Sequence, residues 1–309
     1  TNGMVARQKR ESIWGNMRRH KALYWMTLPG MLYFILFKYV PLLGSVIAFQ
    51  DYQIFKCLLK SPWVGLENFI YIFQYPDFYR ILGNTVKIGF AQILYGFPAP
   101  ILLALLLNEV GNRKLKRCMQ TVLYLPHFLS WAIIGSILFD LLSLNGVVNS
   151  VRTAFGMDPI LYMQKADCFV PIVILSSIWK EMGWSAIVYL AAIAGISPEL
   201  YEAAVVEGAS RLKQALYITF PLLLPTITVM FLLRVGNFLN LGFEQIYVLM
   251  TPMTQSVGDI LDTYVYQYGV LEGKYSMTTA IGLFKSIFGL VLMVLCNSLS
   301  KYATGRGVY

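Results

Sequence analysis

SPELYEAAVVEGASRLKQALYITFPLLLP, residues 197–225, is a polar stretch in a chain whose other long segments are mostly apolar. Pro198 suits the first position of a helix, because its missing N–H would be unpaired there, and the hydroxyl of Ser197 is placed to cap that helix. Gly208 tolerates backbone conformations that side chains disfavour, so one helix can end there and another can begin at a new angle. We expect two prolines to close the unit, Pro221 and Pro225. The stretch therefore predicts a short helix, a glycine elbow and a second helix.

The composition of the whole chain places this unit in a membrane protein. The 309 residues are 57% hydrophobic and 13% charged, with a mean hydropathy of +0.59. A water-soluble domain is less apolar than this, and polar segments interrupt the chain too often for a single membrane anchor. We therefore expect an all-α membrane protein that crosses the bilayer several times.

Apolar runs long enough to cross the hydrocarbon core of a bilayer predict six transmembrane helices. They lie at about residues 23–49, 88–107, 120–142, 169–196, 222–241 and 277–299. Residues 1–22 mix basic and apolar side chains, which is typical of an amphipathic helix on an anionic membrane surface. The predicted organisation is this N-terminal segment followed by a six-span domain, residues 23–309, which contains the polar unit at residues 197–221.

The positions of the basic residues indicate the side of the membrane on which each segment lies. Lys and Arg are enriched in short cytoplasmic loops. Residues 108–118 hold four of them, and residues 197–221 add Arg211 and Lys213. With six spans, both termini and the polar unit are then cytoplasmic. The formal charge of +9 reflects this topology, so no nucleic-acid partner is expected.

Patterns for catalysis and metal binding are weak. The two histidines lie in different segments, and His127, beside Pro126, is expected to be a hydrogen-bonded residue at a helix kink. Residues 269–274, GVLEGK, are one residue shorter than a phosphate-binding loop and lack its Ser or Thr. We therefore expect no catalytic site, no metal site and no cofactor on this chain.

The four cysteines have neither the spacing of metal ligands nor that of a disulfide framework. They are Cys57, Cys118, Cys168 and Cys296. Free thiols are expected, with a Cys57–Cys168 bridge outside the membrane as the alternative.

The polar unit also resembles a known motif, the EAA loop of permeases in ATP-binding-cassette importers. The resemblance rests on the spacing of Glu202-Ala203-Ala204, Gly208 and Pro221, although Glu207 and Phe220 stand where Asp and Leu are commoner in the family. In that family the loop is a coupling helix that docks on a cytoplasmic ATPase subunit and carries its motion into the membrane. The resemblance implies a coupling role for Glu202, Ala203, Ala204, Glu207, Gly208, Ala209 and Pro221.

Further stretches resemble the carbohydrate-importing branch of these permeases. They are PWVGLENF at residues 62–69, the segment at 76–85, and NFLNLGFEQIY at 237–247. The similarity covers nearly the whole chain and extends to the subgroup for oligosaccharides and polysaccharide fragments, which includes a permease of an alginate importer. It implies a bacterial cytoplasmic membrane, a second homologous permease, two ATP-binding subunits that hold ATP and magnesium, an extracytoplasmic solute-binding protein and an oligosaccharide substrate.

Polar side chains within the predicted spans are candidates for the substrate path. Ionisable groups at membrane depth cost a few kcal/mol, so they face the protein interior or a water-filled path. Aromatic side chains suit stacking on sugar rings. The candidates are Asn237, Glu244, Tyr247, Lys180, Arg234, Trp179, Asn240 and Lys285. Salt bridges between spans and side chains that reach the interface are the structural alternatives.

Three cations in this set favour an acidic glycan, such as alginate fragments. They are Lys180, Arg234 and Lys285. Glu181 follows Lys180 directly, and adjacent residues point to different sides of a helix, so we do not expect these two to pair. The alternative function is a secondary transporter or channel that uses buried charges as a proton relay, which has no need of an EAA-like loop.

Overall fold

The computed structural model of the chain describes residues 20–56 and 60–304. Nearly all of the predicted N-terminal amphipathic segment lies outside the described residues. Cys57 lies outside them too, so the Cys57–Cys168 alternative stays untested. In the described residues the regular secondary structure is helical, apart from one isolated antiparallel bridge between Gln50 and Trp63.

Four helical rods are long and apolar enough to cross a membrane. The first is Lys21–Phe49, made of α2 (Lys21–Phe34), η1 (Ile35–Tyr39), α3 (Val40–Leu43) and η2 (Gly44–Phe49). The second is Phe78–Glu109, made of α6 (Phe78–Ala91), η4 (Gln92–Gly96) and α7 (Pro98–Glu109). The third is Arg211–Gly236, made of α13 (Arg211–Gln214), η7 (Ala215–Thr219) and α14 (Phe220–Gly236). The fourth lies in α18 (Tyr275–Thr304).

Two further helix pairs are sharply bent. α8 (Arg113–Tyr124) and η5 (Leu125–Phe128) meet α9 (Trp131–Leu141) at 101°, and α11 (Ala166–Ala194) meets α12 (Pro198–Val206) at 72°. The structure therefore has four candidate spans, or up to six if each bent pair is one span, where the sequence predicted six. The first bend follows Pro126, beside the expected kink residue His127, and a proline removes a backbone donor.

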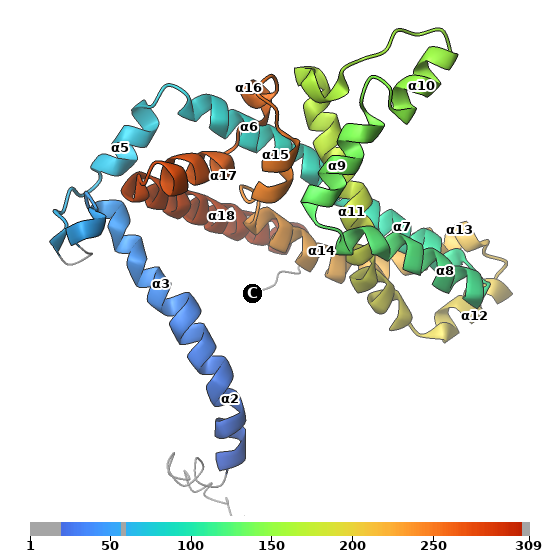
Figure 1. Cartoon of the computed structure of the whole chain (residues 1–309). Coiled ribbons are helices and arrows are strands. Elements are labelled where there is room, and N and C mark those ends of the chain that lie inside the picture. Colours follow the sequence, from blue (N-terminus) through green and yellow to red (C-terminus); the bar gives the residue numbers. More distant parts are fainter. Residues whose placement is uncertain (1–19, 57–59, 305–309) are drawn as a thin grey trace, which may run out of the picture.

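Short helices connect these rods. They are η3 (Ile54–Lys56), α5 (Glu67–Gln74), α10 (Val147–Ala154), η6 (Tyr162–Gln164), α15 (Phe243–Leu249), α16 (Gln255–Gly258), α17 (Leu261–Tyr264) and η8 (Val265–Leu271). α5 and α17 lie at one end of the molecule, and α12 and α13 lie at the opposite end beside the start of α8 (Figure 1). The two ends are thus linked by the long rods.

The predicted helix, elbow and second helix are confirmed in residues 197–225. Pro198 is the first residue of α12, and Gly208 has a positive φ of 76°, a conformation that favours glycine. The predicted Ser197 cap is wrong, because its side chain makes no capping hydrogen bond, whereas Ser210 caps α13.

The prediction that two prolines close this unit is also wrong. The helix continues from Arg211 to Gly236 through both Pro221 and Pro225. Pro221 lies in the first turn of α14, directly after the π-helical segment η7. A π-turn shifts the register of the backbone hydrogen bonds. A proline is tolerated in the first turn that follows, because a backbone N–H at this position would have no helical partner. The second helix of the unit is therefore the start of a span.

The buried core is formed where the rods cross. α11 packs between α7 and α14 around Ala186, Tyr189 and Leu223, which are at most 1% exposed. Side chains at Gly289 of α18 and Gly89 of α6 would overlap the carbonyl oxygens of Gly236 and Phe238, respectively. Because both positions are glycine, α18 and α6 can pack closely against the end of α14.

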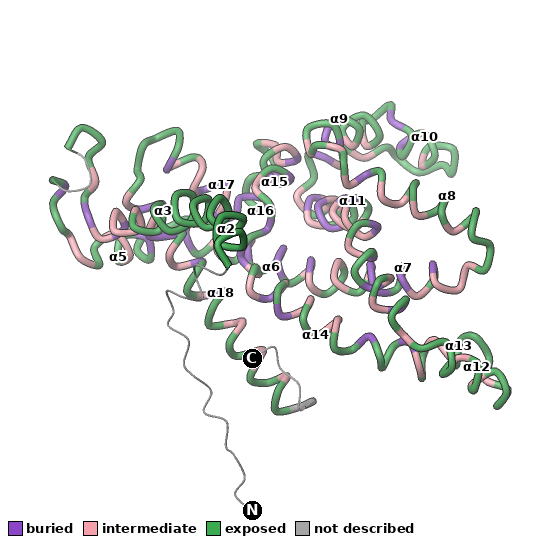
Figure 2. Tube along the Cα trace, turned by 90° about the horizontal axis from the view of Figure 1, so that it is seen from below, coloured by how far each residue is buried: buried purple, intermediate pink, exposed green. Residues whose placement is uncertain are grey.

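The first rod contrasts with this core. α2 has no buried residue in the described chain (Figure 2), and it stands away from the packed helices (Figure 1). Its exposed side chains are largely apolar. α2 therefore lies outside the packed part of the described chain.

Candidate functional site

A cavity of about 400 Å³ lies where η4, α11 and α14 meet. Its polar lining consists of Gln92, Ser177, Glu181, Ser185, Tyr189, Arg234 and Asn237. The cavity therefore brings together two of the predicted path residues, Arg234 and Asn237, with polar groups that had not been predicted as site residues.

Arg234 is held in place by a side chain from another rod. Its Nη2 donates a hydrogen bond of 2.5 Å to Oε1 of Gln92, which is 4% exposed. Gln92 is the first residue of the π-helical segment η4, and such segments often lie at functional sites because they change the direction of side chains. This contact orients the guanidinium at the cavity wall, where its other N–H groups can serve as donors.

Asn237 lies directly after α14, and its Nδ2 donates to the carbonyl of Leu233 at 3.0 Å. Asn240, which follows one turn later, is exposed and its Nδ2 lies 3.5 Å from Oδ1 of Asn237. Both residues are exposed, and of the two Asn237 lines the cavity.

Lys180 belongs to a cluster at the 101° bend rather than to the cavity lining. Its Nζ donates to the carbonyl oxygens of His127 and Leu129, at 2.7 and 2.6 Å. A bent helix leaves such carbonyls without backbone donors, and in a membrane they must be satisfied by protein groups. Lys180 thus satisfies the carbonyls that the bend between η5 and α9 leaves free.

Glu181 joins the same cluster and also lines the cavity. Its Oε2 lies 2.9 Å from Nδ1 of His127, whose ring stacks on Trp184 with centroids 4.5 Å apart. The prediction for His127 is confirmed, since it is a hydrogen-bonded residue at a kink. The expectation that Lys180 and Glu181 do not pair is wrong, because Nζ lies 3.9 Å from Oε1. Both side chains turn toward the same bend, although they leave the helix in different directions.

Lys285 lies away from the cavity. Its Nζ forms an ion pair with Oδ1 of Asp262, which joins α18 to α17, and the side chain is 8% exposed. This is the interhelical salt bridge that the sequence left open as an alternative. Among the three predicted cations, the cavity lining therefore contains Arg234.

The remaining predicted path residues are on the surface. Trp179 and Tyr247 are 45% and 49% exposed, and Glu244 is exposed. Tyr247 stacks on Phe243 and contacts Tyr266 edge to face, with centroids 5.0 and 5.2 Å apart. A role for these three residues stays a prediction.

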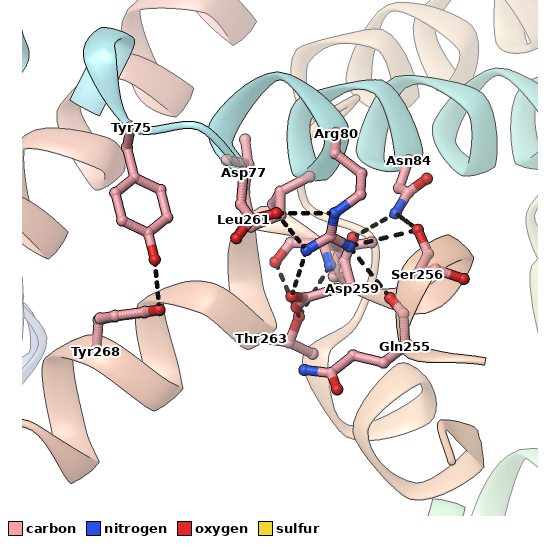
Figure 3. A network of polar contacts seen from close by, with 12 residues as sticks. Tyr75, Asp77, Arg80, Asn84, Gln255, Ser256, Asp259, Leu261, Thr263 and Tyr268 are labelled. Carbon is pink, nitrogen blue, oxygen red and sulfur yellow. Dashed lines mark hydrogen bonds and ion pairs between the residues drawn. The ribbon is translucent and has the colours of Figure 1, made fainter. Parts of the chain in front are cut away.

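A second polar network ties α6 to the segment around α16 (Figure 3). Arg80 contacts Asp77 at 3.1 Å and Asp259 at 3.9 Å, and its Nη1 donates to the carbonyls of Gln255 and Ser256. Asn84 donates to the carbonyls of Ser256 and Asp259, both at 3.0 Å. Sequence reasoning missed this network, although Asp77 and Arg80 have helical i,i+3 spacing.

Burial raises the pKa of the Asp259 carboxyl, and the neighbouring Asp77 raises it further. A hydrogen bond from the Thr263 hydroxyl, the charge of Arg80 and the backbone N–H of Ile260 lower the pKa in part. The carboxyl is therefore easier to protonate than an exposed aspartate.

The predicted coupling residues are mostly accessible. Glu202, Ala203, Glu207, Gly208 and Pro221 are exposed, and Ala204 and Ala209 are half-buried. A second cavity, of about 480 Å³, lies between α12 and α8. In residues 20–56 and 60–304, no three His, Cys, Asp or Glu side chains are grouped so that they could hold a metal ion.

Residues 96–303 match the protein family described as binding-protein-dependent transport system inner membrane component. Two relatives from Bacillus subtilis (strain 168) are each 45% identical to the chain. Protein LplB is similar over 294 residues, which are 95% of this chain and 92% of LplB. The polygalacturonan/rhamnogalacturonan transport system permease protein YteP is similar over 304 residues, which are 98% and 95% of the two chains.

Two solved structures have the same fold. A chain of a bacterial transporter that imports the acidic polysaccharide alginate superposes with a TM-score of 0.86 and 39% identity, over 94% of this chain and 99% of that chain. A chain of the bacterial alginate transporter in complex with a periplasmic protein that carries an alginate pentasaccharide gives 0.87 and 38%, over 96% and 99%.

Proposed function

The chain belongs to the inner membrane components of binding-protein-dependent transport systems, as a carbohydrate-importer permease of the ATP-binding-cassette class, and we propose that it carries acidic oligosaccharides inward. It is a non-catalytic, multi-pass subunit of the inner membrane. Two of the proteins described above handle acidic polysaccharides, polygalacturonan and rhamnogalacturonan in one case and alginate in the other. Fragments of such polymers are the proposed cargo.

The observation that carries this proposal is the position of Arg234 in the cavity. A guanidinium oriented by one neutral partner can bind a carboxylate with its remaining donors. Glu181 also lines the cavity, but the ammonium group of Lys180 lies 3.9 Å from its carboxylate and offsets part of its charge, and His127 is hydrogen-bonded to the same carboxylate. Its oxygens, together with Asn237 and the serines, suit the hydroxyl groups of a sugar. A uronosyl residue has both kinds of group.

We further propose that α12 and α13 are the coupling unit and lie in the cytoplasm. Val205, Val206 and Leu212 are 62%, 88% and 70% exposed, which is more apolar surface than a free cytoplasmic helix usually shows. The proposed occupant is an ATP-binding subunit, which holds ATP and magnesium. The complete transporter then has this chain, a second permease, two ATP-binding subunits and a solute-binding protein outside the membrane.

Uptake into proteoliposomes that contain the complete transporter tests the cargo. We expect ATP-dependent uptake of trigalacturonate, and little uptake of the neutral trisaccharide maltotriose. Arg234→Gln is expected to reduce trigalacturonate uptake by about tenfold or more, because a hydrogen bond to a charged group is worth about 1.5–3 kcal/mol. Arg152→Gln, in α10 away from the cavity, is the charge-matched control.

Equal uptake of the two sugars, unchanged by Arg234→Gln, would contradict an acidic cargo. It would leave the assignment as a carbohydrate-importer permease intact.

A further inference from the structure

The coupling unit is held to the rest of the chain by few contacts. α12 has no buried residue, although Tyr201 and Ala204 are half-buried on its inner side. An exposed ion pair between Arg211 and Glu109, at 3.7 Å, links α13 to the end of α7. Exposed pairs contribute little to stability, so this one holds α13 to α7 only weakly and does not touch α12.

One polar contact joins α12 directly to the rod that follows the elbow. The hydroxyl oxygens of Tyr201 and Thr219 lie 2.9 Å apart and share a hydrogen bond. Thr219 is 1% exposed, so its hydroxyl is shielded from water. This hydrogen bond is shorter than the other contact of the hydroxyl, 3.4 Å to the carbonyl oxygen of Gln214, and water cannot readily replace it at a buried site.

Thr219 also lies where the rod is irregular. It is the last residue of the π-helical segment η7, and its Oγ1 is 3.4 Å from the carbonyl of Gln214, five residues earlier. α14 starts at the next residue and continues for 17 residues, which is about 25 Å at 1.5 Å per residue. Its last turn carries Arg234, and Asn237 follows directly.

We infer that the Tyr201–Thr219 hydrogen bond transmits movement of α12 to α14, and so to the cavity residues at the far end of α14. The inference rests on the proposed coupling function and adds its route. Tyr201 and Thr219 are then positioning residues for transport. The competing routes are the two covalent links of α12, to α11 through Ile196 and Ser197 and to α13 through the elbow at residues 207–210.

The first test is the amount of sugar taken up per ATP hydrolysed by the complete transporter, with trigalacturonate as the probe. Tyr201→Phe and Thr219→Val each remove one hydroxyl. Each is expected to lower this ratio about fivefold, the factor that one net hydrogen bond represents, while ATP hydrolysis stays within about twofold of wild type. The double variant is expected to be no worse than either single variant, because both remove the same bond.

Matched variants separate coupling from folding. Thr219→Ser keeps the hydroxyl and is expected to restore most of the ratio lost in Thr219→Val. Tyr95→Phe and Thr121→Val make the same chemical changes at exposed positions outside the proposed route. Thermal unfolding of each complex identifies any variant that is simply less stable.

A second readout needs no sugar. In a transporter without its native cysteines, a single cysteine in place of the exposed Asn240 is labelled with a maleimide, with and without ATP and vanadate. We expect ATP and vanadate to change the labelling rate severalfold, and Tyr201→Phe and Thr219→Val to abolish most of that change.

If both variants keep the wild-type ratio and labelling response, the inference is overturned and the covalent links of α12 to α11 and α13 suffice. A third outcome is that ATP and vanadate change the labelling of the parent, that Tyr201→Phe abolishes this change, and that trigalacturonate is not taken up. The inference then holds and the proposed cargo is wrong. If ATP and vanadate leave the labelling of the parent unchanged, both the coupling role and the inference are wrong.

Discussion

At the scale of single residues, Lys180 illustrates how a charged group in a span can serve structure. Its ammonium group satisfies two backbone carbonyls at the bend and lies beside Glu181. Lys180→Met removes the donor and leaves these acceptors in a poorly hydrated environment. We expect a loss of about 3 kcal/mol in the free energy of unfolding, and a lower unfolding temperature in nanodiscs.

Lys165→Met is the matched control for this prediction. Lys165 is exposed and immediately precedes α11, the helix that carries Lys180. An unfolding temperature of Lys180→Met equal to that of Lys165→Met would show that the bend does not depend on the ammonium group.

Asp259 predicts a pH effect outside the spans. The pKa of the Asp259 carboxyl is raised in the folded chain. The carboxyl therefore binds a proton more readily when the segment around α16 is packed against α6, the closed state, than when this segment is locally unfolded, the open state. The stability that comes from this proton is fully present below the open-state pKa of about 4, and it is lost as the pH rises through the higher folded pKa. We expect amide protection of residues 255–263 to increase severalfold as the pH falls in this range.

Asp259→Asn should abolish this pH dependence, because the amide does not titrate. Asp77→Asn should reduce it only in part, because Asp77 contributes to the raised pKa but burial is the larger cause. Hydrogen exchange, corrected for the intrinsic effect of pH, measures both. Equal pH dependence in Asp259→Asn and wild type would assign the effect to another group.

At the scale of elements, the elbow at Gly208 is open to a direct test. Its φ of 76° is a conformation that a β-branched residue adopts only with strain, although no neighbouring atom would obstruct a Cβ there. Gly208→Val should therefore change the angle between α12 and α13 rather than the packing. We expect uptake per ATP hydrolysed to fall severalfold while ATP hydrolysis continues.

Gly111→Val is the control for the elbow, because Gly111 lies between α7 and α8 with open space around it and without a positive φ. Wild-type uptake per ATP in Gly208→Val would argue against a coupling role for the elbow.

The elbow was predictable from sequence, whereas the bend at Pro126 was predictable only in part. Helix signals in residues 197–225 are local, so Pro198 and Gly208 marked α12 and its end correctly. The 101° angle and the contacts of Lys180 depend on residues about 50 positions apart in the chain. The network of Arg80 with Gln255, Ser256 and Asp259 is similarly long-range, and no periodic pattern indicates it.

At the scale of the whole molecule, hydropathy predicted the class of protein well and the spans less well. Four rods pass the length and composition test directly, and the two bent pairs do so only jointly. The substrate path was less predictable still. From the sequence, Lys180, Lys285 and Arg234 were equal candidates, because all three lie within predicted spans. The structure distinguishes them: Arg234 lies at the cavity wall, whereas Lys180 and Lys285 bind other parts of the chain.

The whole molecule also distinguishes the proposed importer from a secondary transporter. We expect the purified chain alone, reconstituted with a proton gradient, to transport no measurable trigalacturonate, because its proposed cavity residues are driven by a coupling unit that needs an ATPase. Reconstitution with the partner subunits and ATP is the positive control. Uptake by the chain alone would support a proton relay through buried charges.

The contacts of Lys180 also constrain the order in which the membrane domain is assembled during synthesis. Lys180 and Glu181 lie in the middle of α11, where charged residues make insertion of an isolated helix unfavourable. Their partners at His127 and Leu129 are synthesised first. Pairing with carbonyls that are synthesised earlier would therefore offset part of the free-energy cost of inserting Lys180 with α11.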